Sequence, residues 1–178
     1  MVGGLDEETT GLFTEVTNVL IGAGREELTA PIWSPHLTFQ LFDRALPLAV
    51  REELQRLAER TAPVTLELRG LGFFRWPRPV AYVTVVRTFW LDHLFHQIAE
   101  VTAHAGFRPR PNYEADRWVP HISLVLDDHR GQTLRALRAW EERGLFVGSA
   151  MMNRLVVLGE EPKPLLEERF SGELRARR

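Results

Sequence analysis

The chain has 178 residues, of which 44% are hydrophobic and 26% are charged, a composition that excludes a fibrous protein or long disorder and suits a single domain. Its 24 acidic and 22 basic side chains leave a net charge of −2, so no overall field attracts nucleic acid and any attraction for phosphate has to be local. The chain has no cysteine, which excludes disulfides, thiolate nucleophiles and cysteine-ligated zinc or iron–sulfur centres.

Helices and strands can be predicted in chain order from the spacing of apolar residues. Apolar side chains at helical spacing, with charges between them, predict helices at 6–20, 48–60, 90–105 and 132–143. Short alternating or apolar runs between turn residues predict strands at 64–68, 80–86, 145–150, 155–158 and 166–170. Together with the two strands described next, this order predicts an α+β protein with two similar lobes.

One segment of eleven residues occurs twice. Residues 33–43 read WSPHLTFQLFD, and residues 118–128 read WVPHISLVLDD, in register at an offset of 85 residues. In both copies apolar and polar residues alternate, which predicts a strand with one buried face. Each strand carries the pattern His-x-[Thr/Ser], so the repeat predicts a site with two histidines.

The alternation also predicts which side chains face the site. Successive side chains of a strand point to opposite faces, so residues two apart share a face. The side chains predicted to lie together are His36, Thr38 and Gln40 in the first copy, and His121, Ser123 and Val125 in the second. The intervening apolar residues are expected in the core.

Two imidazoles are suited to proton transfer at a phosphodiester. Near neutral pH one can be neutral and the other protonated, so that one accepts a proton while the other donates one. The hydroxyls of Thr38 and Ser123 can donate hydrogen bonds to the phosphate oxygens on which charge accumulates. This chemistry needs no covalent enzyme intermediate, and we expect no cofactor.

The paired motifs resemble those of the two-histidine (2H) phosphoesterase superfamily, the LigT-like or 2′-5′ RNA ligase group, over most of the chain. The resemblance implies an α+β fold of two pseudo-symmetric lobes, with antiparallel sheets flanking a central cleft and helices outside. It also implies catalytic roles for His36, Thr38, His121 and Ser123.

A single domain over residues 1–178 is expected, with lobes of roughly 1–79 and 80–178. Members of this family usually open with a strand before the first helix, whereas only residues 1–5 precede the first predicted helix here. That strand is therefore expected to be either very short or missing.

Positive charge and aromatic rings near the cleft would hold an anionic substrate with stacked bases. The candidates are Arg75 and Trp76 in the turn before the central strand, and Tyr113 and Arg117 before the second motif. The alternative for each is an ordinary solvated loop residue. His93 and His96 have a spacing that could ligate a metal, but no set of carboxylates completes it, so no metal site is predicted.

The resemblance further implies a metal-independent phosphodiesterase acting on RNA ends or nucleotides with a 2′,3′-cyclic phosphate or a 2′-5′ linkage, and the same site run in reverse would join RNA ends. One alternative is a non-catalytic protein that binds RNA ends or nucleotides. Another is a phosphodiesterase for small cyclic phosphates such as ADP-ribose derivatives. Neither a signal peptide nor a membrane span is apparent, so a cytoplasmic monomer without a membrane contact or an obligate protein partner is expected.

Overall fold

The computed structural model describes residues 1–22, 33–75, 79–126, 137, 140–142, 144, 146–159 and 163–173. Its helices are α1 (Glu7–Gly22), α2 (Leu48–Glu59), α3 (Phe89–His104) and the short 3₁₀ helix η1 (Pro111–Tyr113). Its strands are β1 (Val2–Leu5), β2 (His36–Thr38), β3 (Val64–Phe74), β4 (Val80–Val85), β5 (His121–Leu126), β6 (Val147–Val157) and β7 (Leu166–Arg169). The predicted helix at 132–143 lies largely outside the described residues.

All the strand pairs are antiparallel, and the strands follow the order β1-β2-β5-β4-β3-β6-β7. Because β1 also pairs with β6, six of these strands close into a ring and β7 extends it beyond β6. The predicted α+β class with antiparallel strands is confirmed. Strands from residues 1–79 and from 80–178 are intermixed around the ring, and the division into lobes at this position stays a prediction.

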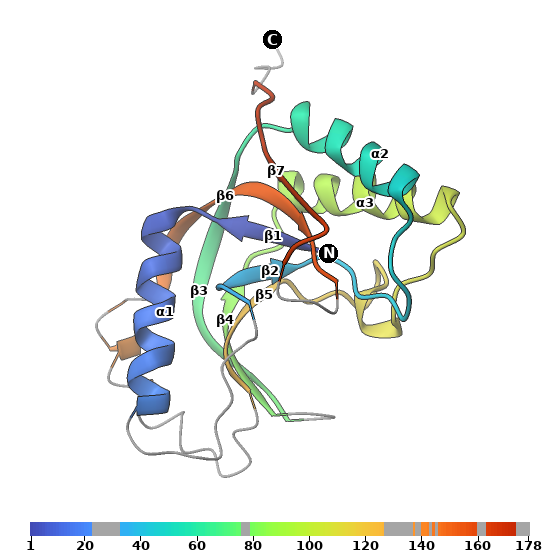
Figure 1. Ribbon diagram of the computed structural model, residues 1–178. Coiled ribbons are helices and arrows are strands. Elements are labelled where there is room, and N and C mark those ends of the chain that lie inside the picture. The colour runs from blue at the N-terminus through green and yellow to red at the C-terminus, as the bar shows by residue number, and fades with distance from the viewer. Residues whose placement is uncertain are drawn as a thin grey trace.

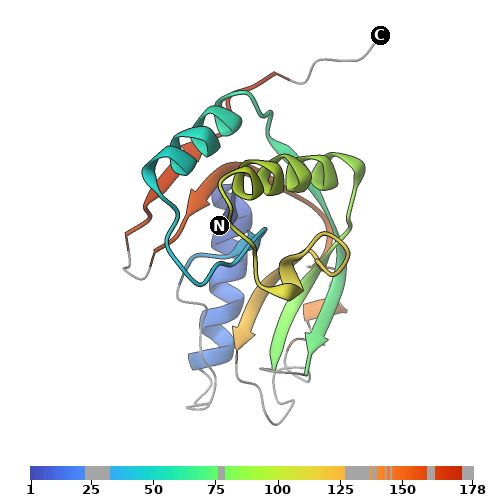
Figure 2. The same ribbon diagram turned by 90° about the vertical axis from the view of Figure 1, so that its right-hand side faces the viewer.

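The helices cover the outside of the ring of strands. Helix α1 lies on one flank, whereas α2 and α3 lie beside each other on another (Figure 1). Figure 2 shows α2 and α3 from the side, across one end of the strands. Thr17 of α1 donates a hydrogen bond of 3.0 Å to the carbonyl of Leu124 in β5, so the first helix is fixed to the strand that carries the second motif.

The chain begins with a very short strand that lies between β2 and β6. All four residues of β1 are buried, and Leu5 is completely inaccessible to solvent. A strand paired on both sides is shielded from further strand addition, which an open edge would invite. The expected opening strand is therefore present, in its short form.

Two predicted strands, at 145–150 and 155–158, are in fact one continuous strand, β6. Arg154, which lies between the two predicted ranges, is within paired backbone, opposite Gly4 of β1 and Arg169 of β7. A long arginine stem can cover apolar surface while its charged end stays accessible. Among the described helices, none is both long and apolar enough to cross a membrane.

Candidate active site

The two repeated segments lie side by side as β2 and β5. Leu37 of β2 pairs with Ile122 of β5, and both side chains are completely buried. Their neighbours along each strand therefore point to the opposite face of the sheet. The structure thus places both histidines and both hydroxyl residues on one face, and all four side chains are half-buried.

The antiparallel register crosses the two motifs. Since residue numbers run in opposite directions from the Leu37–Ile122 pair, His36 lies beside Ser123 and Thr38 lies beside His121. The two histidines are then diagonal neighbours on adjacent strands, and such residues are roughly 7 to 8 Å apart. This spacing leaves room for one phosphate group between two imidazoles.

Both imidazoles are held by the same local hydrogen bond. Nδ1 of His36 lies 2.7 Å from the carbonyl oxygen of Ser34, and Nδ1 of His121 lies 2.7 Å from that of Val119. A carbonyl can only accept, so Nδ1 carries the proton in each ring. Nε2 of each neutral imidazole is then the atom that can accept a proton from a reacting group, or donate one after protonation.

Burial lowers the pKa of His36 and of His121 below the ordinary value of 6.5. In each case the hydrogen bond to the backbone carbonyl partly offsets this effect, and at His36 the charge of His121 lowers the pKa further. Proximity of the two rings thus has an electrostatic consequence: protonation of one disfavours protonation of the other.

Aromatic residues that were not predicted surround His121. Its ring centroid lies 4.9 Å from that of Phe74 and 5.1 Å from that of Tyr82, and these two rings stack at 4.2 Å. Tyr82 pairs with Ser123 on one side and with Gly72 on the other. A Cβ at Gly72 would overlap the Tyr82 ring, so this glycine allows the tyrosine to lie flat beside the site.

A pocket opens beside the other histidine. It has a volume of about 230 Å³ and is lined by residues that include His36, Trp33, Gly4 and Arg154. The half-buried arginine lies in β6, within the predicted break between strands, and was not a candidate in the sequence. Its position beside the site depends on the pairing of β6 with β1, which no local pattern reveals.

Trp118 packs in the hydrophobic core. It is buried and stacks between Phe39 and Phe95, with ring centroids 5.8 and 4.3 Å away. Its indole N–H donates a hydrogen bond of 2.8 Å to the carbonyl of Thr38. The residue that begins the second repeat therefore fixes the backbone of the first, which is a packing role.

Two residues predicted on the histidine face lie elsewhere. Strand β2 ends at Thr38, and Gln40 is buried, where its side-chain oxygen accepts a hydrogen bond of 3.0 Å from Thr102. In β5 the register shifts by one residue, because Ala81 pairs with Val125 while Tyr82 pairs with Ser123. This bulge turns Val125 into the core, where it is completely buried.

The four residues predicted to bind substrate differ in their exposure and in their neighbours. Arg75 is exposed and follows Phe74, the residue that contacts His121, whereas Trp76 lies outside the described residues. Tyr113 packs against the core, and burial raises the pKa of its hydroxyl. Arg117 is exposed, 3.8 Å from Asp116. Substrate binding by these four residues stays a prediction.

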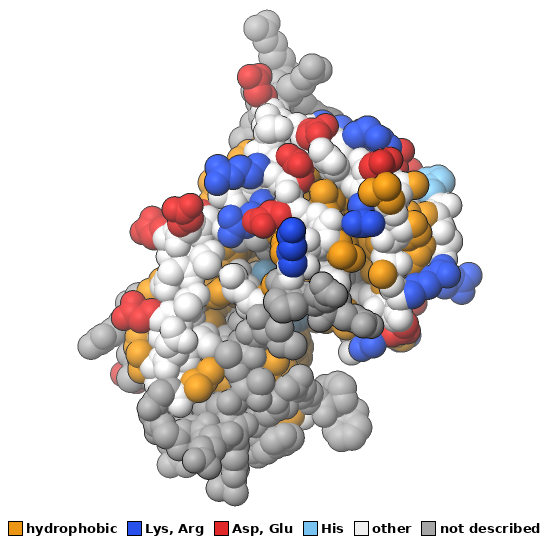
Figure 3. Space-filling view, in the orientation of Figure 1, with side chains coloured by type: hydrophobic (Ala, Val, Ile, Leu, Met, Phe, Trp, Pro, Cys, Tyr) orange, Lys and Arg blue, Asp and Glu red, His pale blue; other side chains and the backbone are white. Residues whose placement is uncertain are grey.

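Charge is mixed on the face seen in Figure 3, where basic and acidic side chains alternate over the helices and the adjoining sheet. In the described part of the chain, no group of three or more histidine, aspartate or glutamate side chains could hold a metal ion. The helical pair His93 and His96 therefore has no third ligand among those residues.

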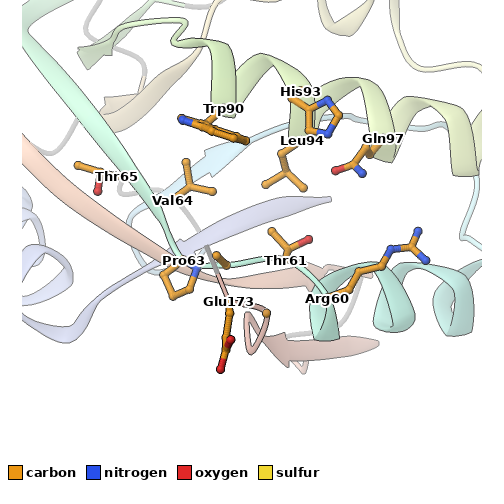
Figure 4. A pocket seen from close by; sticks show the side chains of 12 residues that line it. Arg60, Thr61, Pro63, Val64, Thr65, Trp90, His93, Leu94, Gln97 and Glu173 are labelled. Atoms are coloured by element: carbon orange, nitrogen blue, oxygen red, sulfur yellow. The ribbon is translucent and has the colours of Figure 1, made fainter. Parts of the chain in front are cut away.

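Another pocket, of about 1000 Å³, lies away from both histidine motifs. Figure 4 shows Trp90, Leu94 and Gln97 projecting from α3 toward Thr61 and Val64. Among the described residues that line it are one histidine, His93, and one carboxylate, Glu173, but no second histidine. The two histidine motifs on β2 and β5 are therefore the candidate site for proton transfer.

Comparison with known proteins agrees with this geometry. The family model described as the 2′-5′ RNA ligase superfamily matches residues 23–163, which include both histidine motifs. The crystal structure of TT0787 of Thermus thermophilus is similar in fold, with a TM-score of 0.63, 20% sequence identity and coverage of 97% of each chain. No curated protein sequence matches this chain. With two His-x-[Thr/Ser] motifs crossed on adjacent strands and a family match over most of its length, the chain belongs to the 2′-5′ RNA ligase superfamily, the 2H phosphoesterases.

Proposed function

We propose that the protein is a metal-independent phosphodiesterase that acts on 2′,3′-cyclic phosphates or 2′-5′ linkages at RNA ends or in nucleotides. The observation that carries this proposal is the crossed arrangement of His36, Thr38, His121 and Ser123 on one face, with each imidazole held through Nδ1. Such a pair can supply an acid and a base on opposite sides of one phosphorus atom.

In hydrolysis of a cyclic phosphate, one imidazole removes a proton from water while the water oxygen forms a bond to phosphorus. The bond from phosphorus to one ribose oxygen breaks, and the second imidazole protonates that oxygen. The products are a phosphomonoester and a free hydroxyl. If the attacking group is the 5′-hydroxyl of another RNA end, the same proton transfers join the two ends.

In this proposed reaction the hydroxyls of Thr38 and Ser123 donate hydrogen bonds to the non-bridging oxygens, on which negative charge develops. Each lies beside the histidine of the other motif, so the two can approach the phosphate from opposite sides. Donors that are already oriented need no reorganisation during the reaction, which makes this kind of stabilisation effective.

Wild-type protein should hydrolyse at least one member of a panel of 2′,3′-cyclic nucleotides, 2′-5′ dinucleotides and RNA with a cyclic phosphate end. Activity should persist with excess EDTA, because the proposed proton transfers involve imidazoles alone. Chromatographic detection of the products measures both. Binding without turnover would favour a non-catalytic protein that binds RNA ends or nucleotides. Turnover of only an ADP-ribose cyclic phosphate would favour a phosphodiesterase for small cyclic phosphates. A strict requirement for a divalent ion would contradict the mechanism.

The dependence of kcat/KM on pH should be bell-shaped, with its optimum below pH 6.5. Burial lowers the pKa of both imidazoles from that value, and activity requires one protonated and one neutral ring. A bound phosphate anion favours the protonated form, so the optimum of kcat should lie at higher pH than that of kcat/KM. Initial rates at saturating and limiting substrate test this, and an optimum of kcat/KM above about pH 7.5 would contradict it, since both free imidazoles would then be neutral.

A further inference from the structure

Arg154 lies in the same row of the sheet as His36. Gly4 of β1 pairs with His36 on one side and with Arg154 on the other. Residues at paired positions project to the same face of a sheet. Arg154 therefore lies on the face of the catalytic histidines, two strands from His36, or about 9 to 10 Å along the sheet at the usual strand spacing.

The absence of a side chain at Gly4 determines the path of this arginine. A Cβ added at Gly4 would overlap Cγ, Cδ and Nε of Arg154. The stem of Arg154 thus lies directly over the backbone of β1, the strand that separates β6 from β2. Only glycine permits this approach, and the arginine side chain is left 22% exposed.

The charge of Arg154 belongs to the same pocket as His36. Nε of Arg154 lies 3.4 Å from Oε1 of Glu167, an acid whose side chain is half-exposed. That contact does not use the two terminal nitrogens of the guanidinium, which form the fork that binds phosphate in a bidentate manner. Arg169, exposed and paired with Arg154 in β7, does not line this pocket.

The position of Arg154 separates it from the reacting phosphate. In the proposed reaction the phosphorus atom lies between His36 and His121, on the β5 side of His36, whereas Arg154 approaches across β1 from the opposite side. An anion bound by Arg154 would be displaced from the reacting group by one to two strand spacings, about 5 to 10 Å. Successive phosphates of one nucleic-acid strand are separated by a comparable distance.

We infer that Arg154 binds the phosphate next to the reacting one, so that the site prefers RNA ends of two or more nucleotides to mononucleotides. This inference rests on the proposed function and names its substrate class. The half-buried side chain of Trp33 also lines the pocket and provides a surface for the sugar or base between the two phosphates. Glu167 occupies Nε when no phosphate is bound.

Equilibrium binding tests this inference without requiring turnover. The ligands are a dinucleotide with a terminal 2′-phosphate and the matching nucleoside 2′-phosphate, measured by calorimetry. Wild-type protein should bind the dinucleotide about tenfold more tightly, as expected for one charge-assisted phosphate contact. Arg154→Met, which keeps an unbranched stem over Gly4, should remove most of this difference, and Arg154→Lys should keep part of it.

Arg169→Met is the matched control, because Arg169 is the paired arginine one strand farther from His36 and does not line the pocket. It should change the dinucleotide preference less than about twofold, because a distant exposed charge is largely screened. If Arg154→Met weakened the binding of both ligands equally, or weakened the binding of neither, the inference would be overturned. Thermal unfolding establishes that the variant is folded. A retained dinucleotide preference in a protein that turns over no substrate would leave this inference standing and refute the proposed function.

Discussion

Replacement of either histidine by alanine, His36→Ala or His121→Ala, should lower kcat on a 2′,3′-cyclic phosphate by about 10²- to 10⁴-fold, the usual contribution of a positioned general acid or base. The loss should be similar in the two variants, because both imidazoles have the same Nδ1 anchor and lie on the same face. The double variant should lose less than the product of the two single effects, since the two groups act in one transition state.

Several measurements separate this prediction from general damage to the fold. Thermal unfolding should remain cooperative in both variants, because neither ring belongs to the main apolar core. His104→Ala serves as a control: His104 is exposed near the end of α3, and its Nδ1 also contacts a backbone carbonyl, that of Glu100, at 2.8 Å. It should leave kcat unchanged, and activity within about tenfold of wild type in either catalytic variant would contradict the two-histidine mechanism.

The positions of the two motifs could be predicted because their information is local. Alternation along residues 36–38 and 121–123 determines which side chains share a face, and the repeat indicates that the two segments act together. Because Leu37 pairs with Ile122 and both are buried in the core, the histidine-bearing sides of the two strands form one continuous surface. A slip of one residue would turn the apolar side chains of such a strand to the solvent face, so burial of one face disfavours that register.

The remaining parts of the site depend on contacts between distant segments. Arg154 lies beside His36 only because β6 pairs with β1, and the close approach depends on Gly4, far away in the sequence. Val125 was predicted on the cleft face because simple alternation does not include a bulge, and the shift between Ser123 and Val125 reverses its direction. Tyr82 was recognised as part of a strand, but its contact with His121 follows from the register of β4 and β5.

Removal of either hydroxyl should have the second largest effect on catalysis. Thr38→Val keeps the shape of the side chain and Ser123→Ala removes one oxygen atom, and each should lower kcat by about 10²- to 10³-fold, the range measured for one donor that stabilises transition-state charge. KM should change by less than about threefold, because these hydrogen bonds strengthen as charge develops and contribute less to binding of the substrate. Thr38→Ser and Ser123→Thr exchange the residues that the two copies already use, so each should retain activity within about tenfold of wild type, since the donor is kept. Steady-state rates on a cyclic nucleotide distinguish this role from packing. If Thr38→Ser were as inactive as Thr38→Val, the loss of activity would come from the changed shape of the side chain and not from the hydroxyl. Thr38 would then have no direct role at the phosphate.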